Sequence, residues 1–166
     1  MPRPLPASSY WVEPARLAAG AYPAAPADLA ALIAAGIGGF VDLTLAAPMR
    51  GYAEEAARLA QEQGRDALHR RFPVTDFGVP EIATMRAILD AIDEWIAARR
   101  AVYVHCHAGI GRTGTVVACW LVRHGRAPAE AIADLQRLRR FTRDAGTASP
   151  ETAAQRALVA AWRARS

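Results

Sequence analysis

The stretch from Ala101 to Gly114 constrains the fold of this chain more than any other part of its sequence. A short apolar run, Ala101–Val104, is followed by His105-Cys106-His107-Ala108-Gly109-Ile110-Gly111-Arg112-Thr113-Gly114, after which an apolar helical pattern begins. A strand that passes through a glycine-rich loop into a helix points successive backbone N–H groups inward and adds the partial positive charge of the helix N-terminus. The sequence therefore predicts a cradle for a small oxyanion.

The side chains of this loop fit such a cradle. Gly109 and Gly111 allow the backbone to curl tightly. The planar guanidinium of Arg112 can bind two phosphate oxygens at once. Cys106 follows the strand directly, where the loop N–H groups and Arg112 favour its thiolate form. A thiolate that faces a bound phosphate is a nucleophile in front of an electrophile.

The run resembles the signature loop of the cysteine-dependent protein tyrosine and dual-specificity phosphatases: His-Cys, five residues, Arg, Ser or Thr, and Gly. The segments 9–12 and 19–23 also resemble the N-terminal portion of small bacterial dual-specificity-like phosphatases. The resemblance implies phosphomonoester hydrolysis through a phosphocysteine intermediate, without a metal or other cofactor. It implies that the substrate phosphate is bound by His107, Ala108, Gly109, Ile110, Gly111 and Arg112.

Other interpretations of the two cysteines explain fewer of the residues around them. An inert buried thiol at position 106 leaves the glycines, Arg112 and Thr113 unexplained. His105, Cys106 and His107 are too close together to form one tetrahedral zinc site. A thioredoxin-like site needs Cys-x-x-Cys, whereas Cys119 lies far along the next helix and is expected in the core.

An acid must protonate the leaving oxygen of a phosphate ester. The candidate is Asp76, on a loop that follows a strand and is bracketed by Pro73 and Pro80. Its position is similar to that of the general-acid loop of the phosphatase family. A helix cap near Pro80 is the alternative role for this aspartate.

Several further residues are expected in supporting roles, those of Thr113 and Gln155 from the same resemblance. The hydroxyl of Thr113 is expected to assist departure of the thiolate, and His105 to order the loop. The segment Ser149-Pro150-Glu151 with Gln155 resembles a late segment of the family that packs beside the loop, where Gln155 would position water. For Ser149 we predict a simpler role as N-cap of the last helix. Asp42 ends a strand at the same sheet edge and is expected to brace the loop.

The remaining pattern predicts one α/β domain over residues 1–166, with residues 1–9 as a flexible lead-in. A mainly parallel sheet of four to five strands is expected, with helices on both faces and the loop between a central strand and a buried helix. The predicted strands are 10–12, 17–19, 39–44, 67–74 and 101–105; the predicted helices are 26–35, 52–63, 81–98, 113–124, 129–140 and 151–163.

Composition limits the partners. The net charge is +4, and all 20 basic residues are arginine. No aromatic residues interleave the arginine pairs at 70–71, 99–100 and 139–140, so we expect solvated element ends rather than a nucleic-acid surface. No window is long and apolar enough for a membrane span. The two cysteines and the absence of a visible signal peptide favour a reducing, cytoplasmic location.

The expected partner is a phosphorylated protein or peptide. The loop is more similar to those of tyrosine phosphatases than to those of phosphoinositide phosphatases, which often carry lysine there. Phosphotyrosine is therefore the predicted substrate, with phosphoserine and phosphothreonine left open. The alternatives are a phosphoinositide or other non-protein phosphate, and a non-catalytic phosphate-binding pseudophosphatase.

Overall fold

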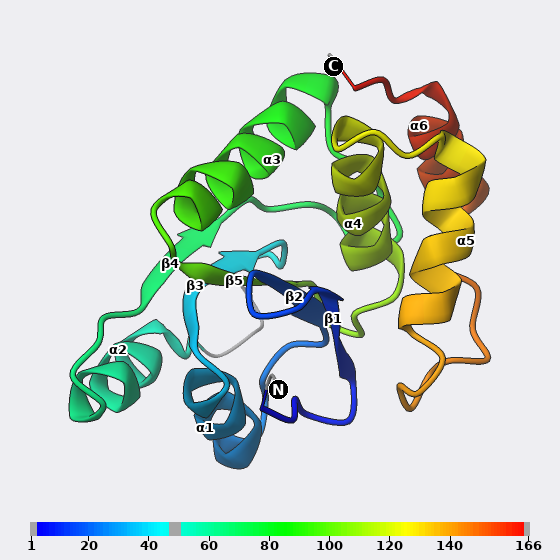
Figure 1. Ribbon diagram of the computed structural model, residues 1–166. Coiled ribbons are helices and arrows are strands. Elements are labelled where there is room, and N and C mark those ends of the chain that lie inside the picture. The colour runs from blue at the N-terminus through cyan, green and yellow to red at the C-terminus, as the bar shows by residue number, and fades with distance from the viewer. Residues whose placement is uncertain (1–2, 47–50, 165–166) are drawn as a thin grey trace.

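A five-stranded sheet in the order β1-β2-β5-β3-β4 forms the centre of the molecule (Figure 1). The structure, a computed structural model, describes residues 3–46 and 51–164. The strands are β1 (Ser9–Glu13), β2 (Leu17–Gly20), β3 (Ile37–Asp42), β4 (Leu68–Arg71) and β5 (Ala101–His105). β1 and β2 form an antiparallel hairpin, and all other neighbours are parallel. The predicted mainly parallel sheet and its edge hairpin are confirmed.

The strand register brings the catalytic candidates to one edge of this sheet. The last residue of β5, His105, pairs with Gly20 of β2 on one side and with Asp42 of β3 on the other. Because parallel strands end at the same edge, the loop that starts at Cys106 lies between the ends of two neighbouring strands. Open α/β sheets bind ligands at such an edge.

Helices cover both faces of the sheet (Figure 1). One face carries α1 (Pro26–Ala34) and α2 (Ala53–Glu62). The other carries α3 (Ile82–Ala97), α4 (Gly111–Arg123), α5 (Pro128–Leu138) and α6 (Ala153–Ala161). Each face has its own apolar core because the strand side chains alternate between the two. Among the described residues, no helix meets the length and apolarity needed to cross a membrane.

Helix α4 is the buried helix that the sequence predicts. Eleven of its thirteen residues are buried, and it packs against α5, α6 and α3 as well as the sheet. Its start at Gly111 lies two residues before the predicted start, so Gly111 and Arg112 of the loop already form its first turn. A helix enclosed in this way has its N-terminus in a fixed position, and the expected oxyanion cradle would depend on that position.

The structure corrects several details of the expected elements. β4 is an edge strand that ends at Arg71 instead of 74, so its Leu68 is exposed. Ile82, although apolar, is 55% exposed because the helix begins there, before its apolar face reaches the core. Arg139 is buried rather than solvated, because it donates to the carbonyl oxygens of Asp144 and Thr147.

The N-terminal segment has defined contacts from residue 3 onward. Arg3 donates to the carbonyl of Ala34 over 2.9 Å, and Leu5 packs against the core on the α1 side. Ser9, the last residue of the expected flexible lead-in, is already the first residue of β1.

Candidate active site

The loop after β5, residues 106–112, which we call the signature loop, surrounds the Cys106 thiol with backbone. Cys106 is buried, and the N–H of Gly109 points at its Sγ over 3.3 Å. Gly109 has φ +77°, and a Cβ there would lie 2.4 Å from the backbone carbon of Gly20. Glycine is required for both reasons: the left-handed conformation and the close approach of β2. Along the rest of the loop, His107 and Ala108 are exposed, whereas Ile110 and Gly111 are buried.

Two segments distant in sequence hold the loop from outside. The N–H of Tyr22, after β2, donates to the carbonyl of His107 over 3.0 Å. The hydroxyl of Ser149 donates to the carbonyl of Ile110 over 2.6 Å. A Cβ on Gly114 would lie only 1.9 Å from Ser149 Oγ, so α4 needs glycine where Ser149 passes. The loop is therefore braced by neighbours on two sides.

Ser149 is where the sequence prediction is wrong about role. The N-cap of α6 is Thr152, whose side chain accepts from the N–H of Gln155. Ser149 is buried three residues earlier and bonds the signature loop instead. The Ser-Pro-Glu resemblance was the only sequence feature that placed this segment beside the loop.

Arg112 joins the signature loop to the loop that carries Asp76, which we call the acid loop (residues 74–80). The Arg112 side chain is buried. Its Nη1 donates to the carbonyl of Val74 over 2.9 Å, and its Nη2 lies 3.1 Å from Asp76 Oδ1. The Nε donor of Arg112 is also buried and has no hydrogen-bond partner among the described residues. An unmade hydrogen bond from a buried cation is costly, so this donor suits an anionic ligand.

Asp76 lies on an exposed turn of the acid loop. Its side chain is 64% exposed, and its Oδ1 accepts from the N–H of Phe77 over 3.0 Å. Phe77 is 59% exposed and has φ +60°. The N-cap of α3 is Glu81, without a side-chain cap bond, so Asp76 does not cap that helix.

His105 is held beneath the loop in its neutral form. Its Nε2 lies 2.5 Å from the Tyr52 hydroxyl and its Nδ1 lies 3.0 Å from the Cys106 carbonyl. Burial lowers the pKa of His105 to about 4, although nearby Asp42 acts in the opposite direction. A buried histidine with both ring nitrogens engaged by protein groups is suited to holding the loop rather than to exchanging protons.

Asp42 anchors a polar cluster at the end of β3. Its carboxylate accepts from the backbone and hydroxyl of Thr44, from His69 and from Arg71. Burial acts to raise the pKa of Asp42, but these hydrogen bonds and nearby His105 outweigh it and leave the pKa well below its ordinary value. Asp42 Oδ1 lies 4.0 Å from His105 Nε2, so the cluster sits directly behind the loop.

The other predicted residues fall around the same loop. Thr113 is buried, and its hydroxyl donates to the Gly20 carbonyl over a long 3.4 Å. Gln155 is buried against Gly111, where a Cβ would lie 3.0 Å from both amide atoms of its side chain. Cys119, on α4, is buried in the core; burial raises its pKa to about 12. Among residues 3–46 and 51–164, no group of three metal-ligating side chains occurs.

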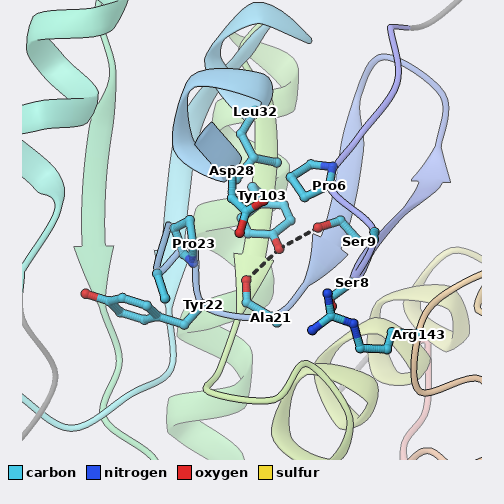
Figure 2. A pocket seen from close by; sticks show the side chains of 12 residues that line it. Pro6, Ser8, Ser9, Ala21, Tyr22, Pro23, Asp28, Leu32, Tyr103 and Arg143 are labelled. Atoms are coloured by element: carbon cyan, nitrogen blue, oxygen red, sulfur yellow. Dashed lines mark hydrogen bonds between the residues drawn. The ribbon is translucent and has the colours of Figure 1, made fainter. Parts of the chain in front are cut away.

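A separate pocket of about 200 Å³ is lined in part by Ala21 and Tyr22, the segment whose N–H binds the His107 carbonyl (Figure 2). The Tyr103 hydroxyl donates to the Ala21 carbonyl over 2.7 Å and lies 3.0 Å from Ser9 Oγ. These contacts fix Ala21, and with it the Tyr22 N–H that holds the signature loop. Figure 2 shows Arg143 beside Ser8 at the edge of this pocket.

Known proteins are similar to parts of this chain in sequence. The family model of the Swiss Army Knife protein, DSP-PTPase phosphatase domain, matches residues 6–161. The chain is 33% identical over 94 residues to the phosphatidylinositol 3,4,5-trisphosphate 3-phosphatase and protein-tyrosine-phosphatase PTEN1 of Arabidopsis thaliana, covering 55% of this chain and 22% of that one. It is 39% identical over 66 residues to the dual specificity protein phosphatase CDC14C of Homo sapiens, covering 39% and 14%. The chain thus matches less than a quarter of the length of either relative.

Solved structures resemble almost the whole chain. Tk-PTP in its active form superposes with a TM-score of 0.71 and 25% identity, covering 92% of this chain and 93% of that one. Kinase associated phosphatase (KAP), with its catalytic cysteine replaced by serine, gives a TM-score of 0.69 at 22% identity, covering 94% and 92%. From the match over residues 6–161, together with this architecture, it follows that the chain belongs to the dual-specificity type of the protein tyrosine phosphatase family.

Proposed function

We propose that this protein hydrolyses phosphomonoesters through a phosphocysteine intermediate and that its substrate is phosphotyrosine in proteins. The observation that carries the proposal is the surrounding of Cys106. The buried Cys106 thiol accepts from a loop N–H, and the same loop leads to Arg112, whose buried Nε has no hydrogen-bond partner among residues 3–46 and 51–164. Donors preorganised for an oxyanion stabilise the charge that develops in phosphoryl transfer.

In the first step, the Cys106 thiolate attacks phosphorus while the bond between phosphorus and the ester oxygen breaks. The departing oxygen takes the proton of the Asp76 carboxyl group. Arg112 and the loop N–H groups bind the other phosphate oxygens. The Asp76 carboxyl lies 3.1 Å from Arg112 Nη2, which supports a place for it beside the phosphate.

In the second step, a water molecule attacks the phosphorus of phosphocysteine and gives its proton to the Asp76 carboxylate. The sulfur–phosphorus bond breaks and returns the Cys106 thiolate, with inorganic phosphate as product. Thr113 would assist by donating a hydrogen bond from its hydroxyl to the departing thiolate. Its present bond, 3.4 Å to the Gly20 carbonyl, is long enough to be exchanged at little cost.

The choice of phosphotyrosine is supported by the acid loop. Phe77, next to Asp76, presents an exposed aromatic ring that can pack on the ring of a phosphotyrosine. The Arabidopsis relative is named as a phosphatase of both a phosphoinositide and protein tyrosine, which makes a phosphoinositide the second candidate. This chain contains no lysine with which to bind the additional phosphates of such a lipid.

The test measures phosphate release from a phosphotyrosine peptide, a phosphoserine/phosphothreonine peptide, a phosphoinositide and an aryl phosphate, with Cys106→Ser as the blank. Turnover that is fastest on the phosphotyrosine peptide supports the proposal. Turnover confined to the lipid would keep the mechanism and replace the substrate. No turnover on any of them, with retained binding of inorganic phosphate, would instead identify a phosphate-binding pseudophosphatase.

A further inference from the structure

The Gln155 side chain lies where three segments of the site meet. It is fully buried, and its Oε1 accepts from the backbone N–H groups of Glu151 and Thr152 over 2.9 and 3.1 Å. Its Nε2 donates to the carbonyl of Gly78, in the acid loop, over 3.1 Å. On its third side, Gly111 of the signature loop approaches so closely that a Cβ would lie 3.0 Å from it.

These bonds limit what Gln155 can do chemically. An amide oxygen has two lone pairs, and both are used by the start of the last helical segment. Gln155 therefore has no free acceptor for a water molecule. The bond that reaches out of its own segment is the one to Gly78, so its link to the chemistry runs through the acid loop.

The acid loop depends on few contacts. Val74 and Pro80 are buried at its ends, whereas Asp76 and Phe77 between them are exposed. Arg112 holds one end through the Val74 carbonyl. Gln155 holds the other end through the Gly78 carbonyl. Asp76 lies between these two points, and its carboxyl group also contacts Arg112 Nη2 directly over 3.1 Å. The backbone position from which Asp76 makes this contact depends on both ends of the loop.

We propose that Gln155 is a positioning residue, which keeps the acid loop over the signature loop so that Asp76 can deliver its proton. This inference rests on the proposed function for its catalytic consequence. The hydrogen bond from Gln155 to the Gly78 carbonyl, which we call the latch, is a structural claim that can be tested separately. Removing one hydrogen bond of this kind should let the loop leave its position and reduce proton delivery about five- to tenfold.

The decisive variant is Gln155→Glu. Glutamate keeps an oxygen for the N–H groups of Glu151 and Thr152, and is a common partner in a helix capping box. It lacks the N–H hydrogens, and its ionised carboxylate would face the Gly78 carbonyl. The variant thus breaks the latch while keeping the start of α6. Gln155→Met, of similar length and without polar atoms, serves if the glutamate variant fails to fold.

Thr152→Ala is the matched control. It removes the hydroxyl that caps α6, which is bonded to the N–H of Gln155, and leaves the bond to Gly78 untouched. A loss of activity caused only by a loosened α6 would appear in this control as well. A loss through the acid loop would appear only in the Gln155 variants.

The kinetic readout is the dependence of kcat on the leaving group. For Gln155→Glu we expect a five- to tenfold lower kcat on an alkyl phosphate and little change on p-nitrophenyl phosphate, whose leaving oxygen needs no acid. In an Asp76→Asn background, the same change should have no further effect, because the loop then has no proton to position. An equal loss on both substrates, or a full loss in that background, would overturn the proposal.

Hydrogen exchange tests the latch without using activity. The Gly78 N–H, which donates to the Thr75 carbonyl, reports whether the acid-loop turn is kept. In Gln155→Glu, a peptide covering residues 74–80 should exchange at least about fivefold faster, and in Thr152→Ala it should not. Unchanged exchange would refute the latch. Inactivity of the unsubstituted protein on every phosphate ester would refute the proposed function alone, since the exchange result stands by itself.

Discussion

The signature loop and the acid loop meet at one site but are built in opposite ways. The signature loop is held firmly. Cys106 is buried, and Tyr22 and Ser149 bind two carbonyl groups of the loop from outside. The acid loop is open: the Asp76 side chain is 64% exposed, and two side chains hold the loop at its ends. An oxyanion cradle has to be preorganised, because its donors must not rearrange during the reaction. A proton donor must let substrate in and product out.

The largest effect is expected from the signature loop. Cys106→Ser replaces the proposed sulfur nucleophile with a much weaker hydroxyl nucleophile and should lower turnover of an aryl phosphate by about 10⁴-fold or more. The loop N–H groups and Arg112 remain, so the affinity for inorganic phosphate, measured by calorimetry, should stay within about threefold. Turnover within tenfold of the parent protein would show that Cys106 is not the nucleophile.

Removing the acid tests the open loop. Asp76→Ala should lower kcat by about 10²–10³-fold on an alkyl phosphate, because the leaving oxygen then departs without a proton. On p-nitrophenyl phosphate the loss should be much smaller. The measurement is kcat against the pKa of the leaving group. A loss of the same size for every leaving group would assign Asp76 a binding role instead.

Acid should destabilise the framework under the signature loop. The pKa of His105 is lowered by burial to about 4, below the ordinary 6.5, so between these values the unfolded chain binds more protons than the folded one. Stability should therefore fall as pH drops from 6.5 to 4, by up to about 3 kcal/mol from this residue. Urea unfolding across this range measures it. His105→Asn should flatten the slope, and an unchanged slope in that variant would place the effect elsewhere.

The smallest effect is expected from a brace of the signature loop. Ser149→Ala leaves the Ile110 carbonyl without its partner and should cost about 1–2 kcal/mol of unfolding free energy. KM for an aryl phosphate should rise severalfold as the loop loosens. Ser8→Ala is the control, because that hydroxyl has no hydrogen bond within the described residues. Equal effects of the two substitutions would contradict the role given to Ser149.

The fold could be predicted because its local patterns agree with one another. The alternation of apolar strands and amphipathic helices gave the parallel sheet, and the glycine-rich run after β5 placed the site at its carboxyl edge. Element ends were less certain, since they depend on neighbours. Leu68 and Ile82 are exposed although apolar, because one lies on an edge strand and the other begins a helix.

The part of the site that lies within one short segment of the chain could be predicted from the sequence. Cys106, Gly109 and Arg112 lie in one loop whose geometry follows from a strand, two glycines and a helix. Ser149 was assigned the wrong role, because a serine before a helix in sequence is a common cap. Its actual partner, Ile110, lies in a distant segment that only the packing of α4 against α5 and α6 brings near.

The sequence by itself determined the phosphatase-type loop and the family, because the motif residues lie close together along the chain. It also indicated the parallel sheet, through the alternation of strand and helix patterns, although the paired strands are far apart in sequence. The tertiary structure alone decided how the loop is braced and how the acid loop is held over it. Contacts such as Gln155 with Gly78 and Arg112 with Val74 join segments far apart in sequence. These contacts form only when the helices and strands pack together, and no local sequence pattern predicts which distant segments will meet.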